Sequence, residues 1–205
     1  VGGMDVGFLP GEGGRDRNGI IEGCKFGDIS TVILYGADEI DRDELGGAFV
    51  IYIGSHGDRG AHGADVILPA AAYTEKQAIF VNTEGRAQMS ERAAFPPGDA
   101  REDWKIFRAL SDHLGATLDF DTVDALRKVM FELAPHLSRF DELVPAGKPE
   151  KQVADVTALD ASAFAPALTD YYFTNPIARA SATMAACAES KRERAKAIGG
   201  TGTDG

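Results

Sequence analysis

The sequence predicts an α/β fold: a doubly wound, mostly parallel sheet with flanking helices, followed by a helical extension at the C-terminal end. Three short apolar runs carry this prediction, within Thr31–Asp41, Ala48–Gly57 and Asp65–Pro69. Their apolar residues are continuous rather than alternating, which is typical of strands buried on both faces of a parallel sheet. About twelve residues separate consecutive runs, enough for a crossover with a short helix.

The segment after these runs predicts a hairpin. "AIFVNTEGRAQ" (Ala78–Gln88) consists of two extended stretches joined by a turn at Thr83-Glu84-Gly85. Gly85 can supply the positive φ that such a turn needs. "FPPGDA" (Phe95–Ala100) then predicts a break, whereas "PGEGG" (Pro10–Gly14) near the start predicts only a turn.

Two helices are expected after the break. Asp99 is the expected N-cap of the first, with Glu102 completing a capping-box-like pair, and Gly115 ends it. Asp121 is expected to cap the second helix, which Pro135 closes. Each helix carries one apolar stripe at helical spacing, which indicates a core-facing surface: Trp104, Phe107, Leu110 and Leu114 in the first, and Val123, Leu126, Met130 and Leu133 in the second.

The predicted domain organisation follows the weakening of these patterns after Ser138. Residues 1–143 form the α/β part, 144–170 a linker and irregular segment, 171–198 the C-terminal helix, and 199–205 a disordered tail. In the C-terminal helix, Asn175 is the expected N-cap and Pro176 takes the first helical position. Its alanine- and serine-rich face allows another element to approach closely; that face includes Ile177, Ala180, Met184 and Cys187.

The composition argues against several classes of protein. The formal net charge of the 205 residues is −11, whereas nucleic-acid-binding proteins present basic surfaces to phosphates. Cys24 and Cys187 are the two cysteines and lie far apart, so the chain cannot hold an iron–sulfur cluster or a structural zinc alone. We expect both to be reduced core residues in an intracellular setting. We expect no membrane span and no signal peptide, and the glycine-rich start without methionine indicates a piece of a longer polypeptide.

A cluster of ionisable residues follows the second predicted strand: His56, Asp58, His62 and Asp65. Two imidazoles and two carboxylates suit a divalent metal or an acid–base pair. The spacing argues against both, because His56 and His62 would lie on opposite faces of a helix. Glycines recur at every third position here, which favours a tight structural loop, with Asp65 capping it.

The position of this loop also bears on function. In open α/β sheets, ligands bind beyond the carboxyl ends of strands, where Tyr35–Asp38 and Gly54–Gly60 would lie. Glycine-rich turns let a backbone approach phosphate, and Arg59 could pair with that phosphate. Binding of a nucleotide-like cofactor is therefore one of the alternatives. Neither stretch is a GxGxxG or a P-loop. The sequence contains no convincing nucleophile. The next polar residues suggest a surface pair, Glu75 and Lys76, and a polar hairpin turn from Asn82 to Arg86 that includes Glu84.

Longer strings resemble known families. "ADVILPAAAYTEKQAIFVNTEGRAQ" (Ala64–Gln88) resembles the molybdopterin oxidoreductase superfamily, which includes formate dehydrogenases and nitrate reductases. "GSHGDRGAHGADVILP" (Gly54–Pro69), with Arg101–Asp112 and Tyr171–Ala185, is similar to the large iron–sulfur subunit of respiratory complex I, the proton-pumping NADH:quinone oxidoreductase. These matches run from Asp5 to Ala188, nearly the whole chain.

The resemblance implies a subunit of two parts. An N-terminal part with cysteine-ligated 2Fe-2S and 4Fe-4S clusters would precede residue 1, and residues 1–143 would be the C-terminal part of a molybdopterin-oxidoreductase-like domain that has lost its cofactor. The chain would then be a scaffold of an enzyme, with no catalytic, cofactor-binding or metal-binding residues and no cofactor of its own. Its expected partners are other peripheral-arm subunits and the rest of its own polypeptide, not nucleic acid or a membrane interior. Its expected location is the cytoplasmic face of a bacterial plasma membrane or the matrix side of the mitochondrial inner membrane.

Two alternatives stay open from the residues. One is the cofactor-binding domain of a molybdopterin-dependent oxidoreductase such as a formate dehydrogenase, with the ends of strands 31–35 and 48–53 on a pterin dinucleotide. The other is a metal-dependent hydrolase that uses the histidine–aspartate cluster. The scaffold hypothesis instead expects Arg59 and His62 to fill the former pocket by pairing with Asp58 or Asp65. An open, cofactor-sized pocket lined by Gly54–Asp65 would count against it.

Overall fold

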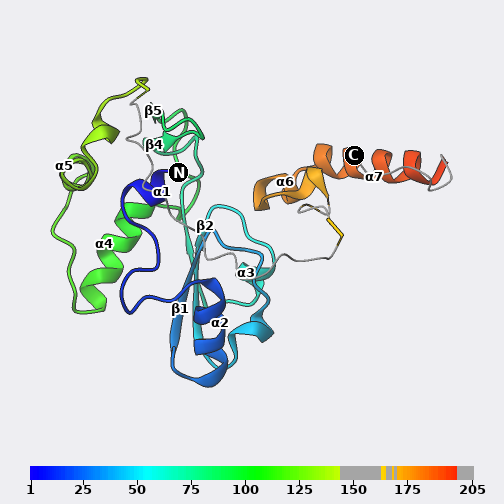
Figure 1. The fold of residues 1–205 in the computed structure, drawn as a ribbon, viewed down its shortest axis with the longest axis horizontal. Helices are drawn as coiled ribbons and strands as arrows, with labels where there is room; N and C mark the ends of the chain where they lie inside the picture. The colour runs from blue at the N-terminus through cyan, green and yellow to red at the C-terminus, as the bar shows by residue number, and fades with distance from the viewer. Residues whose placement is uncertain (144–162, 165–167, 169, 198–205) are drawn as a thin grey trace. The chain divides into compact units, whose positions relative to one another are not determined.

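The computed structural model describes residues 1–143, 163–164, 168 and 170–197 (Figure 1). The chain divides into two compact units, Val1–Gly147 and Lys148–Gly205, which are described separately below. The predicted linker falls mostly, and the predicted tail wholly, outside the described residues, so the predicted domain boundaries stay predictions. Among the residues that the structure describes, no helix has both the length and the apolar composition needed to cross a membrane.

The centre of the first unit is a parallel sheet of three strands. These are β1 (Thr31–Tyr35), β2 (Phe49–Gly54) and β3 (Val66–Pro69), in the order β1-β2-β3. Ile33 pairs with Ile51, and Ile51 with Val66. The α/β fold with a mostly parallel sheet and flanking helices is therefore confirmed. The order runs in one direction, so the reversal that completes a doubly wound sheet does not fall among these strands.

The central strand β2 is buried on both faces, as its continuous apolar run predicts. On one face, Val50 and Tyr52 pack in a cluster with Ile21 and Cys24 of α2 (Arg17–Phe26). On the other, Ile51 and Ile53 pack with Ile106 and Phe107 of α4 (Asp103–His113). Full burial of an apolar side chain such as that of Val50 or Ile53 stabilises the fold by about 1.5–3 kcal/mol. The sheet thus holds its two helices on opposite faces, with α2 and α4 labelled in Figure 1.

Short elements complete the amino-terminal half of this unit. They are α1 (Gly2–Asp5) and the 3₁₀ turn η1 (Arg42–Leu45).

The α2 helix begins where the Asp16 carboxylate accepts a hydrogen bond from the Gly19 amide at 2.8 Å. It ends at Gly27, whose φ of 83° is the left-handed conformation that glycine adopts most easily. Local sequence therefore sets both ends of the helix that covers one face of the sheet.

The predicted hairpin is confirmed. Strands β4 (Ala78–Val81) and β5 (Ala87–Ser90) are antiparallel, and Gly85 has a φ of 84°. The Asn82 side chain accepts hydrogen bonds from the amides of Glu84 and Arg86, both at 3.0 Å. Asn82 therefore fixes the polar turn, as its place in the sequence predicts.

The predicted cap of α4 is wrong. The helix begins at Asp103 rather than just after Asp99, and its N-cap is Glu102. The reason is a tertiary contact. The Arg101 amide donates to the Pro69 carbonyl at 3.1 Å, and the Arg101 carbonyl accepts from the Ala71 amide at 2.7 Å. Extending the pairing beyond β3 keeps residues 100–101 out of the helix.

The cap predicted for the next helix is displaced by one residue. In α5 (Val123–Leu133), the N-cap is Thr122, whose hydroxyl accepts from the Ala125 amide at 3.1 Å. Asp121 instead pairs with Arg108 of α4 at 3.1 Å. The helix ends before Pro135, as predicted, and the 3₁₀ turn η2 (Pro135–Ser138) follows.

The second unit contains η3 (Tyr171–Phe173), α6 (Pro176–Ala180) and α7 (Ala182–Ala197). Asn175 caps α6 as predicted, accepting from the Ala178 amide at 2.9 Å. The single helix predicted over 171–198 is wrong, because Ser181 is extended, with a ψ of 119°. Its hydroxyl accepts from the Met184 amide at 3.3 Å, so Ser181 starts a new helix instead of continuing the first.

Candidate functional site

The loop after β2 is held closed by its own polar groups. It includes one helical turn, α3 (Arg59–His62), where a tight loop was predicted. The Gly60 amide, at the start of α3, donates to the carboxylate of Asp38 at 2.8 Å. Asp38 follows β1 and is 1% exposed. The carboxylate therefore occupies the position at the loop where an anionic ligand would meet a backbone amide.

Close packing reinforces this contact. A Cβ atom on Gly60 would lie 2.7 Å from the Ala37 carbonyl oxygen, so only glycine allows the approach. The buried Tyr52 hydroxyl donates to the His56 carbonyl, and its ring fills the space beside Gly54. The strand ends are also engaged, since the Gly36 amide donates to the Ile53 carbonyl at 2.8 Å. Three backbone amides at these strand ends, those of Gly36, Asp38 and Gly60, thus bind groups of their own chain.

The four ionisable residues of the predicted cluster do not converge. The His56 Nδ1 lies 3.2 Å from the Ser55 hydroxyl, and Asp58 precedes α3 without capping it. His62 is the last residue of α3. The Asp65 carboxylate accepts from the Val50 amide at 2.7 Å, which ties the start of β3 to β2. Within the described part of the chain, no three His, Cys, Asp or Glu side chains are grouped so as to hold a metal ion.

The ion pair expected for Asp65 differs from the one observed. Arg59 pairs with Asp41 at 3.1 Å, and the basic partner of Asp65 is Arg42, at 3.7 Å, rather than Arg59 or His62. Both ion pairs thus involve η1 or its N-cap. A shallow depression of about 630 Å³ lies beside these pairs, and Arg59, His62 and Gly63 of the Gly54–Asp65 segment line part of it. The rest of its lining comes from Lys25 and from η1 with its N-cap, and residues 54–58 do not line it.

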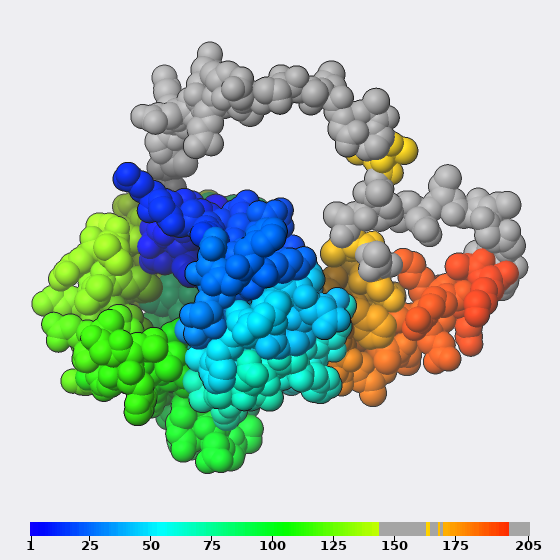
Figure 2. Space-filling model, turned by 90° about the horizontal axis from the view of Figure 1, so that it is seen from below, coloured from blue at the N-terminus to red at the C-terminus, as the bar shows by residue number. Residues whose placement is uncertain are grey.

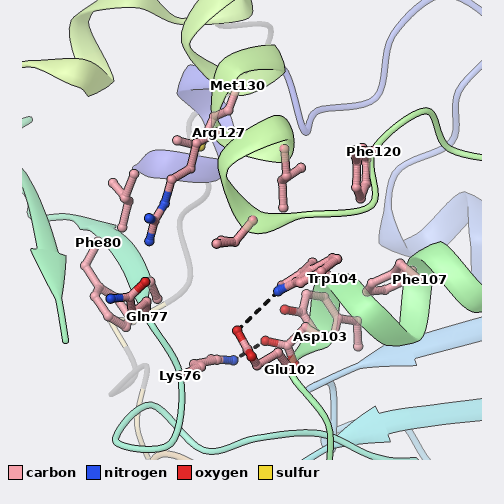
Figure 3. A pocket seen from close by; sticks show the side chains of 15 residues that line it. Lys76, Gln77, Phe80, Glu102, Asp103, Trp104, Phe107, Phe120, Arg127 and Met130 are labelled. Atoms are coloured by element: carbon pink, nitrogen blue, oxygen red, sulfur yellow. Dashed lines mark hydrogen bonds and ion pairs between the residues drawn. The ribbon is translucent and has the colours of Figure 1, made fainter. Parts of the chain in front are cut away.

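A second cavity, of about 510 Å³, lies next to the end of β1 (Figure 3). Its walls come from β4, α4 and α5, and most of its lining side chains are apolar. Tyr35 contributes from β1 and packs edge-on against Phe107, with ring centroids 5.2 Å apart. The volume and the lining are typical of a ligand or docking site.

The floor of this cavity carries paired charges. Lys76 forms an ion pair with Asp103, and both side chains are largely buried. Glu102 accepts from Lys105 at 2.8 Å and from the Trp104 indole at 3.2 Å. Burial opposes the charge on Glu102, but the hydrogen bonds from Lys105 and Trp104 outweigh it and lower the pKa of Glu102. Half of the Tyr35 surface is exposed, but loss of water around its hydroxyl and then the nearby charge of Asp103 raise the pKa of Tyr35 above its ordinary 10.0.

The remaining polar residues singled out in the sequence serve local structure. The Glu75 carboxylate accepts from the Ala72 amide at 2.9 Å. Glu84 lies 3.6 Å from Arg86, whose guanidinium also donates to the Asp141 carbonyl. Only Lys76 of that set lines the cavity.

Sequence reasoning missed the residues that matter most at both places. Asp38 was placed at a strand end, but its pairing with Gly60, 22 positions away, has no local signal. Arg127 lines the cavity, and the sequence contains a pattern that could have identified it. It lies four residues after Val123 and three before Met130, so it is a charged residue on the apolar stripe of α5.

Comparisons with known proteins agree with this architecture. Residues 1–113, just over half of the chain, match the family model described as molybdopterin oxidoreductase. The chain belongs to the molybdopterin oxidoreductase family. Residues 142–187 match a second model, which describes the C-terminal region of the G-type subunit of NADH-ubiquinone oxidoreductase.

Curated relatives narrow the resemblance. The chain is 43% identical to NADH dehydrogenase [ubiquinone] iron-sulfur protein 1, mitochondrial, of Solanum tuberosum, over 91% of this chain and 24% of the relative. It is 44% and 46% identical to the mitochondrial NADH-ubiquinone oxidoreductase 78 kDa subunits of Neurospora crassa and Candida albicans, over 78% and 76% of this chain and 23% of each relative. The chain thus spans about a quarter of the length of these relatives. The predicted resemblance to the large iron–sulfur subunit is confirmed, and none of these names is that of a formate dehydrogenase.

The residues present fit neither a pterin nor an iron–sulfur cluster. Of the two cysteines, Cys24 is buried in the core of the first unit and Cys187 lies in the second. A cluster needs three or four close ligands, which these residues do not supply. At the strand ends, the Asp38 carboxylate already binds the Gly60 amide, and its negative charge opposes a pyrophosphate.

Proposed function

We propose that the chain is a scaffold part of the large iron–sulfur subunit of proton-pumping NADH:quinone oxidoreductase, respiratory complex I. In this proposal the chain holds no redox centre, and the cysteines that bind clusters belong to a part of the polypeptide outside these residues. Its partners are that part and other subunits of the peripheral arm. The subunit lies on the matrix side of the mitochondrial inner membrane or on the cytoplasmic face of a bacterial plasma membrane.

The observation that carries the scaffold proposal is the contact between Asp38 and Gly60. In a domain that binds a cofactor through glycine-rich loops, backbone amides near the strand ends are needed by the ligand. Here a buried carboxylate of the same chain takes that amide at 2.8 Å, and Tyr52 closes the other side of the loop. The names of the relatives, iron-sulfur protein 1 and 78 kDa subunits, support the assignment to this assembly.

The test uses the complete subunit, affinity-tagged in cells that assemble the complex. We expect it to co-purify with NADH:quinone oxidoreductase activity and with less than stoichiometric molybdenum and no oxidised pterin fluorescence. An Asp38→Ala variant should assemble in lower yield, because the Gly60 amide loses its buried partner. The clusters of each assembled complex should keep unchanged electron paramagnetic resonance signals.

Two results would contradict the proposal at different levels. Stoichiometric molybdenum or pterin would overturn the scaffold role. Failure of the tagged subunit to co-purify with NADH:quinone oxidoreductase activity would overturn the assignment to the complex. The matched control is Asp43→Ala, which removes an exposed aspartate of η1 and should leave the yield unchanged.

A further inference from the structure

The cavity beside β1 is lined by a basic side chain, Arg127, whose guanidinium is only partly paired within the described residues. The Nη2 atom of Arg127 is buried and has no hydrogen-bond partner among the described residues. Its Nη1 atom lies 3.7 Å from the carboxylate of Asp124, which is 89% exposed, whereas the Arg127 side chain is only 16% exposed. A buried guanidinium nitrogen without a hydrogen-bond partner is costly, and the ion pair of Nη1 with the exposed Asp124 is long. An anion that reaches Nη2 would complete the arrangement.

The neighbouring acidic side chains are not available to pair with the Arg127 guanidinium, because they already have partners. Lys76 pairs with Asp103, and the Glu102 carboxylate accepts from Lys105 and Trp104. Figure 3 shows the Arg127 side chain extending from α5 toward the side of the cavity where Phe80 and Gln77 lie, apart from this group of paired charges. The cavity therefore combines mostly apolar walls with a guanidinium whose Nη2 atom lacks a hydrogen-bond partner among the described residues.

The wall that carries Arg127 lies outside both regions that match a family model. Residues 1–113 match the molybdopterin oxidoreductase model and residues 142–187 the NADH-ubiquinone oxidoreductase model, whereas α5 spans 123–133. Figures 1 and 2 both show α5 beside α4 on one flank of the first unit. The Arg127 wall of the cavity is thus separate from the region that matches the molybdopterin oxidoreductase model, whereas Lys76, Glu102 and Asp103 lie within it.

We propose that this cavity receives a segment of a partner subunit in which an aspartate or glutamate pairs with Arg127. A carboxylate matches the planar guanidinium in geometry and in charge. A neighbouring apolar side chain of the same segment packs between Phe80 and Trp104. That the partner is another subunit of the complex rests on the proposed function.

Exposure of the aromatic lining favours a protein segment as the occupant. Tyr35 is 52% exposed and Phe80 is 49% exposed, and both line the cavity. Met89 on the neighbouring strand β5 is 41% exposed. A polypeptide crossing the cavity covers these edges in one contact, while its acidic side chain reaches Arg127. Aromatic side chains and arginine are the residues that most often dominate protein–protein contacts.

The test is photo-crosslinking in the assembled complex. A benzoylphenylalanine is introduced in place of Phe80, and the crosslinked peptide is identified by mass spectrometry. We expect a peptide of another subunit with an aspartate or glutamate within a few residues of the crosslink. The same label in place of Phe26, which is 82% exposed on α2 and does not line the cavity, should not reach that peptide.

Charge variants then test the role of Arg127. Arg127→Glu should reduce the crosslink at position 80 by about tenfold or more, and Arg127→Lys should retain most of it. The control is Lys128→Glu, which makes the same charge change one position along α5 at an exposed residue outside the cavity lining. It should leave the yield within about twofold.

The failures are distinguishable. A crosslink to the subunit's own polypeptide, to a peptide without an acidic residue, or to no peptide in an intact complex overturns this inference alone. Equal losses of crosslink for Arg127→Glu and Lys128→Glu also overturn it. A tagged subunit that is absent from the complex overturns the proposed function instead, and co-purification reports this before any crosslinking.

Discussion

Two regions of the first unit lie near the ends of its strands, and they treat their polar groups in opposite ways. In the loop after β2, the Gly60 amide donates a hydrogen bond to the Asp38 carboxylate, and the His56 carbonyl accepts one from the Tyr52 hydroxyl. In the cavity beside β1, the Nη2 atom of Arg127 has no partner among the described residues. A region completed by its own chain is built for stability, whereas one left incomplete is arranged for something outside it. The two regions should therefore respond differently to mutation.

The largest effect is expected from Gly60→Ala. The new Cβ would lie 2.7 Å from the Ala37 carbonyl oxygen and 2.9 Å from Asp38 Oδ1, and neither the backbone nor a buried carboxylate can move away easily. We expect the free energy of unfolding to fall by about 3 kcal/mol. Urea denaturation followed by the fluorescence of Trp104, the single tryptophan, measures it. The control is Gly47→Ala, where a Cβ meets nothing within 4 Å, and which should change stability by less than about 1 kcal/mol.

A smaller loss of stability is expected from Asp103→Asn, which removes the negative charge of the Lys76–Asp103 ion pair in the cavity wall. Lys76 would keep its positive charge while losing its charged partner, and both side chains are mostly buried. We expect a loss of about 2 kcal/mol in the same denaturation measurement. The exposed Asp99 offers the matched substitution, Asp99→Asn. Equal effects of the two variants would show that the Lys76–Asp103 pair does not stabilise the fold.

The contrast between the two regions also shows what sequence alone can predict. The strand β2 and the hairpin turn at Asn82–Gly85 follow from local patterns, because continuous apolar residues and a positive-φ glycine have few other uses. The cap at Asp99 failed because Arg101 pairs with Pro69, a contact between segments far apart in the chain. Local propensity is overridden where a distant backbone offers hydrogen bonds.

The candidate sites were harder to predict for the same reason. The histidine–aspartate cluster is conspicuous in the sequence, yet Asp65 binds the Val50 amide, 15 positions away. The pairing of Asp38 with Gly60 depends on the crossover between β1 and β2, which spacing suggests but cannot position. Arg127 was visible as a charge on an apolar stripe, but whether such a side chain is paired is decided by the elements that pack around it.

A pH-dependent effect, smaller again, is expected from Glu102→Gln. Hydrogen bonds lower the pKa of Glu102 below its ordinary 4.5 in the folded protein. The carboxylate therefore stabilises the fold above that value, and this contribution is lost as the pH falls through the lower, folded-state pKa. We expect the variant to be less stable near neutral pH by below about 1 kcal/mol and to approach the original protein in acid. Denaturation at several pH values tests this; a constant difference would contradict it.

The smallest effect on stability is expected from Arg127→Leu, and it separates the two regions most clearly. Removing a buried guanidinium that lacks a hydrogen-bond partner at Nη2 removes its desolvation cost, and leucine adds apolar contact with the cavity walls. We expect the unfolding free energy of the chain to stay within about 0.5 kcal/mol of the original or to rise. Arg108→Leu is the comparison, because Arg108 pairs with Asp112 at 2.7 Å and with Asp121 at 3.1 Å, although its Nη1 atom is likewise buried without a hydrogen-bond partner. The ion pair of Arg127 with Asp124 is longer, at 3.7 Å, so the loss of Arg108 should lower stability more. If Arg127→Leu is the more destabilising of the two, Arg127 serves the fold of this unit, and the cavity is no longer distinguished from the loop after β2.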